Sequence, residues 1–305
     1  MGNVVSTQSQ VLFGVGCLGG FAAAHQLSGA LLRRLLPKTY GDGGALEQHQ
    51  WQNLTVAGVY TALVAFLGWR ETYGSAAGPV FPPPPATVVG VSAVCRWLTL
   101  SMGAYLVYDF CGILRALRLT REAKEAKEAK GAKGGTEASS DASARSAAAG
   151  KFFHHALGFF GVLSCLFTDM GGKVNMWVYF GEASTPFLSL RWMLLTAGLK
   201  GGALCTACEV LFAAAFTYSR ILSVPGCVRY IWGAREVWKP AWHWAYILAT
   251  TTAFLGQNVF WFAHIVNMVK KALGLGGKKR KAVDKEQAPA NTGGETANKK
   301  GEKAD

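Results

Sequence analysis

The fold is decided by two neighbouring stretches, FFHHALGFFGVLSCLF (residues 152–167) and VYFGEASTPFLSLRW (residues 178–192). Both are apolar enough to lie in a lipid bilayer. Their apolar context nevertheless holds ionisable side chains, namely His154, His155, Glu182 and Arg191. Such groups are costly at membrane depth and usually face the interior of a bundle or a water-filled cavity. The two stretches therefore predict a membrane bundle with a polar interior.

The composition is typical of membrane proteins. Half of the 305 residues are hydrophobic and only 16% are charged, whereas about a quarter of the residues in a soluble domain are charged. Several apolar stretches approach the roughly 20 residues that a helix needs to cross hydrocarbon. The predicted spans are residues 11–32, 51–69, 86–117, 152–167, 174–195, 203–222 and 244–269. We expect an all-α fold, a polytopic transmembrane bundle of about seven spans.

The net charge of +13 is distributed as membrane topology requires rather than as nucleic-acid binding would. Basic residues collect in connections and in the tail, in line with the positive-inside rule. Arg33, Arg34 and Lys38 follow the first span, which places this end in the cytosol and the N-terminus in the lumen. Seven spans then put the C-terminus in the cytosol. We expect an endomembrane protein, for example of the endoplasmic reticulum, with no nucleic-acid partner.

The first six residues, MGNVVS, match the N-myristoylation pattern with Gly2 as the acceptor. A lumenal N-terminus would keep Gly2 away from this cytosolic modification. The two interpretations conflict, and we follow the charge pattern.

The chain divides into three parts. Residues 1–49 hold the first span and a cytosolic linker, and residues 50–271 form the main membrane domain. This domain is interrupted at residues 121–150 by a low-complexity insertion that begins REAKEAKEAKGAK. Its composition predicts a flexible cytosolic linker, transiently helical in the Glu-Ala-Lys part. Residues 272–305 form a disordered, basic, cytosolic tail that is suited to contact anionic lipid.

Polar side chains of several predicted spans fall at similar depth, close to the cytosolic side. They are Asp109, His154, His155, Arg191, Asn258 and His264. Adjacent helical residues point about 100° apart, so only one of the two histidines can face the bundle centre squarely. We expect the set to converge on a cavity.

A purely structural role is the alternative for each of these residues. The histidines could be satisfied by hydrogen bonds between helices, and Glu182 could pair with Arg191. Nine residues of straight helix place those two on roughly opposite faces, so that pair requires a kink at Pro186 or other partners. We assign Glu209 and His25 to structural roles. Cys205 and Cys208 form a CxxC in an apolar run, which indicates helix packing, and we predict no metal site.

Five segments carry a resemblance to a known family. They are QWQNLTVAGVYTAL, MGAYLVYDF, FFHHALGFF, GEASTPFLSLRWML and NVFWFAHIVNMV, and the match that they carry runs over residues 50–271, interrupted by the insertion. The sequence resembles the TLC-domain proteins, which include translocon-associated membrane proteins, ceramide synthases and lipid-homeostasis proteins. The resemblance implies a ring of six helices around a lipid-accessible cavity, preceded by one extra helix.

The resemblance also implies a function. In ceramide synthases a histidine pair, matched here by His154 and His155, and a downstream aspartate pair serve acyl transfer. Residues 179–182 hold Tyr-Phe-Gly-Glu where that aspartate pair would be, which departs from the synthases. The sequence is more similar to the non-synthase members, whose hallmark E-x-S-T/S-P-F-x-x-x-R-W is matched by residues 182–192.

We expect a protein that binds or handles a sphingolipid, ceramide or fatty-acyl species. The expected lipid contacts are Tyr108, Asp109, Glu182, Arg191, Asn258 and His264. The alternative is an acyl-CoA-dependent N-acyltransferase in which His154 and His155 are catalytic and acyl-CoA is the co-substrate. No other cofactor is expected. A receptor or channel ranks last, because no filter motif appears.

Overall fold

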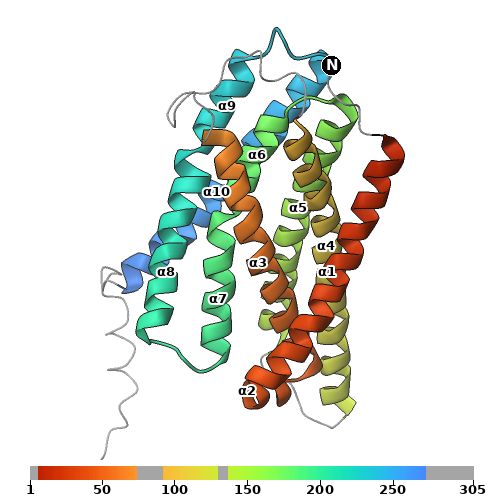
Figure 1. Cartoon of the computed structure of the whole chain (residues 1–305). Helices are drawn as coiled ribbons and strands as arrows, with labels where there is room; N and C mark the ends of the chain where they lie inside the picture. Colours follow the sequence, from red (N-terminus) through yellow and green to blue (C-terminus); the bar gives the residue numbers. More distant parts are fainter. Residues whose placement is uncertain (1–5, 74–91, 130–136, 273–305) are drawn as a thin grey trace, which may run out of the picture. The chain divides into compact units, whose positions relative to one another are not determined.

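The computed structural model describes residues 6–73, 92–129 and 137–272, and Figure 1 shows that its elements are helices. Gly2, most of the tail and part of the insertion lie outside the described residues. Contacts divide the chain into two units, Met1–Phe262 and Ala263–Asp305. The packing and the site described below belong to the first unit.

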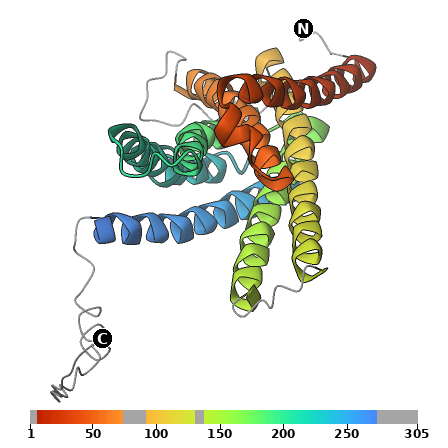
Figure 2. The same cartoon turned by 90° about the horizontal axis from the view of Figure 1, so that it is seen from below.

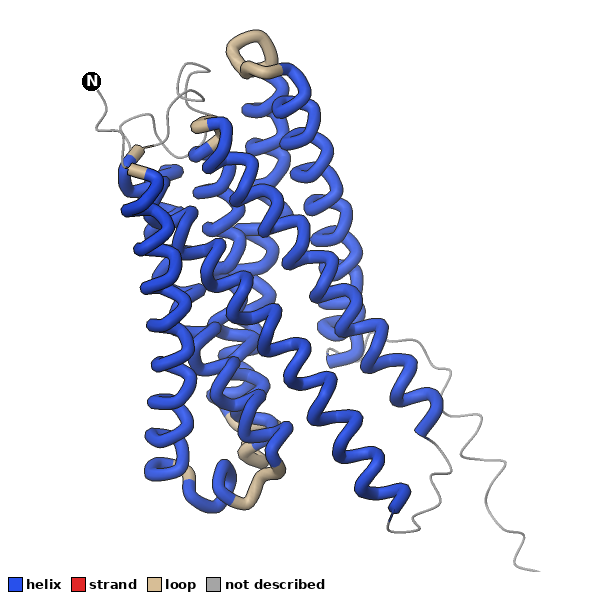
Figure 3. Tube along the Cα trace, turned by 90° about the vertical axis from the view of Figure 1, so that its right-hand side faces the viewer, coloured by secondary structure: helices blue, strands red, loops and turns tan. Residues whose placement is uncertain are grey.

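The described helices coincide with the seven predicted spans, which confirms the all-α polytopic fold. They are α1 (Thr7–Leu35), α2 (Pro37–Gly41), α3 (Ala45–Tyr73), α4 (Ala93–Ala129), α5 (Glu137–Thr168), α6 (Gly172–Phe180), the 3-10 turn η2 (Gly181–Ser184), α7 (Thr185–Thr196), α8 (Ala203–Phe216), the π segment η3 (Thr217–Leu222), α9 (Val224–Gly233) and α10 (Ala241–Ala272). In the described part, four stretches are long and apolar enough to cross a membrane: Thr7–Leu35, Ala93–Ala126, Ala149–Thr168 and Ala203–Gly233. Figure 3 shows the long helices joined by short loops at their ends.

Helix α3 is the centre of the packing, because it contacts α1, α4, α6 and α7. It approaches α6 closely at Gly68, where a Cβ atom would lie 2.7 Å from the Met176 carbonyl oxygen. The core around this contact is apolar and includes Val64, Met102 and Val162. Helix α1 lies on the outer side of α3 and α4 (Figures 1 and 2).

The predicted fifth span is one interrupted helix, α6–η2–α7. Pro186 stands in the first turn of α7, as its missing N–H allows. In the tighter turn before it, the Thr185 N–H donates to the Glu182 carbonyl oxygen. The Gly181 carbonyl oxygen thereby loses its usual α-helical donor, the Thr185 N–H, and it accepts hydrogen bonds from side chains of another helical segment. The break predicted at Pro186 thus creates a local polar site.

Two regions differ from the sequence-based expectation. The insertion is helical at residues 121–129, at the end of α4, and at residues 137–150, at the start of α5, rather than a flexible linker there. Arg118–Glu122 and Arg121–Glu125 form ion pairs of 2.7 Å one turn apart, a spacing that supports an exposed helix. Residues 223–244, predicted to be a loop, contain the helix α9. Cys227 lies one helical turn before Tyr230 and Ile231, and the helix brings all three side chains into one buried apolar cluster.

Candidate functional site

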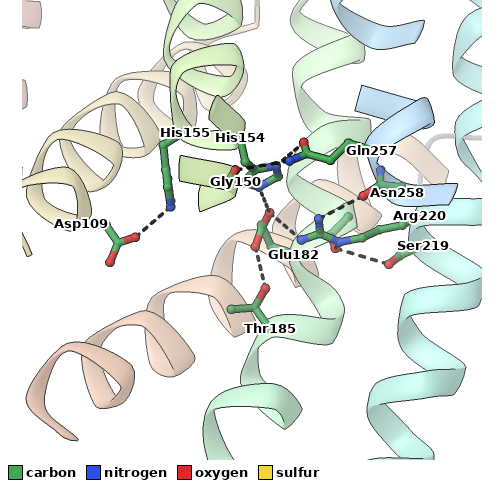
Figure 4. A network of polar contacts seen from close by, with 11 residues as sticks. Asp109, Gly150, His154, His155, Glu182, Thr185, Ser219, Arg220, Gln257 and Asn258 are labelled. Atoms are coloured by element: carbon green, nitrogen blue, oxygen red, sulfur yellow. Dashed lines mark hydrogen bonds and ion pairs between the residues drawn. The ribbon is translucent and has the colours of Figure 1, made fainter. Parts of the chain in front are cut away.

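The two neighbouring histidines of α5 enter different surroundings, and their rings lie at 77° to each other (Figure 4). His155 Nε2 lies 2.9 Å from Asp109 Oδ2 on α4. Asn53 Nδ2 on α3 donates to the other carboxylate oxygen at 2.7 Å. Because an ionised carboxylate only accepts, Nε2 of His155 carries the proton. Its Nδ1 atom is buried without a hydrogen-bond partner.

His154 has the opposite proton arrangement. Gln257 Nε2 donates to the Gly150 carbonyl oxygen at 3.4 Å, which fixes the orientation of this amide because a carbonyl can only accept. Gln257 Oε1 then faces His154 Nδ1 at 3.4 Å and accepts its proton. In the neutral ring, Nε2 of His154 is therefore left with its lone pair. It lies 4.0 Å from Glu182 Oε1, beyond hydrogen-bond distance.

Aromatic rings on α10 hold the His154 ring in place. Phe254 stacks on it with the ring centroids 5.0 Å apart, and Trp261 lies at 5.3 Å. These contacts, together with the hydrogen bond to Gln257, join α5 to α10. The orientation of His154 is therefore set by a helix far from it in the sequence.

Glu182 is neutralised by Arg220, which lies on the π segment η3. Arg220 Nη2 donates to Glu182 Oε1 at 2.9 Å, and its Nε donates to the Gly181 carbonyl oxygen at 2.7 Å. A weaker contact of 3.4 Å joins Nη1 to Asn258 Oδ1, and Thr185 Oγ1 donates to the second carboxylate oxygen at 2.7 Å. The Arg220 residue is 4% exposed. A buried charge pair of this kind depends on such additional hydrogen bonds.

Aromatic rings also surround the Arg220 guanidinium, which lies 5.6 Å from the Phe216 ring centroid and 5.9 Å from that of Phe254. Cations at this distance are attracted by the ring faces. Phe254 therefore contacts both His154 and Arg220. The π segment places Arg220 at this point, and such segments are frequent at functional sites.

A cavity lies between α4, α5, α6 and α10. Its wall is mostly apolar and includes Leu106, Leu157 and Phe254, with His154 and Glu182 among the polar residues that line it. The lining does not include His155 or Asp109, although both are close in sequence to lining residues. The two histidines therefore belong to two regions, one on the cavity and one between α3, α4 and α5.

The predicted convergence on a cavity holds for only part of the set, because His154 and Glu182 line the cavity described above. Asp109 and His155 form a separate pair, and Asn258 is buried beside Arg220 (Figure 4). Asp109 and Asn258, which were expected to contact lipid, are therefore not in the lining of this cavity.

Arg191 does not join the predicted cluster. It pairs with Glu209 on α8 at 2.9 Å, and the two side chains are 31% and 47% exposed. The Glu182–Arg191 pair considered from the sequence is therefore wrong. The two residues lie on different parts of the interrupted helix, and Arg220 occupies the position beside Glu182.

Two other predicted lipid contacts lie elsewhere. The hydroxyl of Tyr108 is 2.8 Å from His25 Nδ1, so it connects α4 to α1, and Tyr108 does not line the cavity described above. His264 belongs to the second unit, and the network described here consists of residues of the first. Within the described ranges, no three His, Cys, Asp or Glu side chains are grouped to hold a metal ion.

Sequence reasoning missed several members of the network: Asn53, Thr185, Arg220 and Gln257. Arg220 carried a usable signal, because it is an ionisable residue in the apolar stretch 203–222. The same rule had selected Glu182. The polar uncharged residues carried no comparable signal, since asparagine, glutamine and threonine are common in ordinary helix contacts.

Fold and site together define an integral membrane protein of helical type with a polar network beside an intramembrane cavity. The model of the TLC domain family (TRAM, LAG1 and CLN8) matches residues 50–267, and the chain belongs to this family. The match runs from α3 into α10 and leaves out α1, whose His25 contacts Tyr108 of the matched region. A search among curated proteins found no match to the chain.

Proposed function

We propose that this protein binds or transfers a lipid in its intramembrane cavity and thereby contributes to membrane lipid homeostasis. The observation that carries the proposal is the cavity wall, in which His154 and Glu182 stand within a largely apolar lining. An acyl chain suits the apolar part, and a polar head group suits the end near His154. Sphingolipids, ceramide and fatty-acyl species combine these two features.

A cavity-filling substitution tests the proposal. Gly161 lines the cavity, and a Cβ atom added there would have no neighbour within 4 Å. Gly161→Leu should therefore fold and occupy space that the lipid needs. The control is Gly19→Leu, because Gly19 lies on the exposed side of α1 and has equally open surroundings. Both variants replace a helical glycine with leucine, so the effect on helix propensity is matched.

Native mass spectrometry of the protein released from detergent gives the readout. We expect a bound lipid in the unmodified protein and in Gly19→Leu, and a loss of most of it in Gly161→Leu. Equal lipid occupancy in all three proteins, or no bound lipid in any, would contradict the proposal.

A second function, acyl-CoA-dependent N-acylation, is favoured by one specific observation: the lone pair on Nε2 of His154, which lines the cavity. In this reaction the amine nitrogen of a long-chain base attacks the thioester carbonyl carbon. The C–N bond forms and the C–S bond breaks. The amine proton passes to Nε2 of His154 and then to the departing CoA thiolate, which leaves as the thiol. A histidine in this position acts as a general base.

The N-acylation reaction is tested by incubating the purified protein with a long-chain acyl-CoA and sphinganine. An amide product that falls at least 100-fold in His154→Ala would establish the enzyme, since general-base catalysis contributes about 10²–10⁴-fold. His25→Ala is the control, because that imidazole belongs to the α1–α4 contact. Absence of product from the unmodified protein would exclude this function and leave lipid binding.

The cellular placement is part of the same proposal: an endomembrane, such as that of the endoplasmic reticulum, with a lumenal N-terminus and a cytosolic C-terminus. The basic tail would contact anionic lipid on the cytosolic face. Protease treatment of sealed microsomes should remove a C-terminal epitope tag and spare an N-terminal one. The reverse pattern would contradict this orientation.

A further inference from the structure

A second polar position in the cavity wall has no assigned partner. Asn175, in the first turns of α6, lines the cavity and is 6% exposed. Its side-chain nitrogen, Nδ2, is buried without a hydrogen-bond partner. An unmet donor of this kind is costly in a folded protein, and it is usually explained by a bound molecule or by function.

The position of Asn175 separates it from the His154 end of the cavity. It precedes Glu182 by seven residues, which corresponds to two helical turns and about 10 Å along the helix axis. Residues seven apart lie on the same face of a helix, and both side chains line the cavity. The cavity wall therefore has a polar position at Asn175 that lies about two helical turns from Glu182, within a lining that is otherwise mostly apolar.

The charges of the wall restrict the ligand. The lining, as far as the described residues show it, contains no lysine or arginine. Its carboxylate, Glu182, is already compensated by Arg220, which also donates to Gly181 and Asn258. A phosphate or carboxylate in the cavity would remain without a counter-charge, and a buried unpaired charge is strongly unfavourable. The amide nitrogen of Asn175 can only donate, so it requires an acceptor.

We propose that the cavity selects an uncharged lipid that carries an acceptor oxygen, a carbonyl or a hydroxyl, and that Asn175 Nδ2 donates a hydrogen bond to it. The inference rests on the proposed lipid-binding function and adds the chemical class of the ligand. Asn175 is then a specificity-determining residue in the cavity wall, separate from His154.

Long-chain probes of a single chain length test the proposal: a fatty alcohol, a primary fatty amide, a hydrocarbon and an alkyl phosphate. Their binding to the full-length protein in nanodiscs is measured by competition against a fluorescent acyl probe. The unmodified protein should bind the alcohol and the amide more tightly than the other two. The leucine in Asn175→Leu is similar in size to asparagine but cannot donate a hydrogen bond. This variant should bind the alcohol and the amide about 3- to 10-fold more weakly, with unchanged affinity for the other two probes.

Thr250→Val is the matched control. Thr250 also lines the cavity, but its hydroxyl already donates to the Tyr246 carbonyl oxygen at 2.9 Å. Removing this hydroxyl should leave the preference among the probes unchanged. A preference that persists in Asn175→Leu, or that disappears equally in Thr250→Val, would overturn the inference while leaving lipid binding intact. Failure of the unmodified protein to bind any probe would overturn the proposed function itself.

The stability of the ligand-free variant gives an independent readout. Asn175→Leu removes a buried donor that has no partner within the protein, so its unfolding midpoint should equal or exceed that of the unmodified protein. A clearly lower midpoint would show that Asn175 is satisfied within the fold and would contradict the inference.

Discussion

His154 and His155 are adjacent in the sequence, yet they belong to regions built in opposite ways. His155 donates its Nε2 proton to Asp109, which also accepts from Asn53, in a closed contact of α3, α4 and α5. His154 donates through Nδ1 to Gln257, and its Nε2 lone pair remains at the cavity wall. The first region fixes helices to one another, whereas the second places an imidazole in the wall of a cavity.

The difference shows that two adjacent side chains of the same type can have different surroundings and different partners. The angle of about 100° between successive helical residues directs one ring to the cavity and the other to a neighbouring helix. Each ring has one nitrogen fixed by a hydrogen bond, and this bond decides which nitrogen carries the proton. The following substitutions should affect the two regions differently.

The largest effect is expected for Arg220→Met on the cavity side. The variant leaves the Glu182 carboxylate buried without its counter-charge, which should cost about 3–5 kcal/mol in the free energy of unfolding. The measurement is an unfolding titration in mixed micelles. Replacing both partners, as Arg220→Met with Glu182→Leu, should restore much of the loss. A single variant as stable as the unmodified protein would contradict the network.

A smaller loss is expected for Asp109→Asn in the closed region. The amide keeps a single acceptor oxygen, so one of the two donors, His155 Nε2 or Asn53 Nδ2, loses its acceptor and the variant should lose about 1–3 kcal/mol. Nitrogen-15 NMR of labelled histidines should show shifted ring resonances for His155, because its charged acceptor is lost, and an unchanged His154. Asp169→Asn is the control, because Asp169 pairs with Arg96 at the surface. A change at His154 instead would contradict the separation of the two regions.

Tyr108→Phe should lose about 1 kcal/mol, because it removes the hydrogen bond to His25 between α4 and α1. Unfolding followed by tryptophan fluorescence measures the change. Lipid binding should remain, since Tyr108 does not line the described cavity. A variant that folds normally but no longer binds lipid would show that the first helix takes part in the cavity.

The smallest effect is expected for Arg191→Met. Its pair with Glu209 is partly exposed, and pairs of this kind contribute about 0–1 kcal/mol. The comparison with Arg220→Met therefore measures how much burial changes the contribution of an arginine–glutamate pair to the free energy of unfolding. An effect on lipid binding as large as that of Gly161→Leu would restore Arg191 to the site.

The architecture was predictable from the sequence, because the length of an apolar stretch and the charges that flank it indicate where a membrane-spanning helix lies. Residues 203–222 were predicted to their ends. The helix α9 was missed because its apolar residues are interleaved with tryptophan, glycine and charge. The helical ends of the insertion were missed because composition alone does not show where a neighbouring helix continues.

The site was predictable in its members more than in its pairings. Burial of ionisable groups pointed to Asp109, His154 and Glu182. The partner of Glu182 was not predictable, since η3 and η2 meet only through the tertiary fold and Arg220 lies 38 residues further along the chain. The division between the two histidines likewise depends on which helices flank α5. The spacing of residues along one helix does not show which other helices pack beside it.

The central claim is that a lipid in the cavity contacts His154 and not His155. Nitrogen-15 NMR of histidine-labelled protein, recorded while a long-chain fatty alcohol is titrated in, tests it most directly. The account predicts that the Nε2 resonance of His154 shifts with saturation while both ring resonances of His155 stay in place. Equal shifts of the two histidines, or a shift of His155 alone, would contradict it.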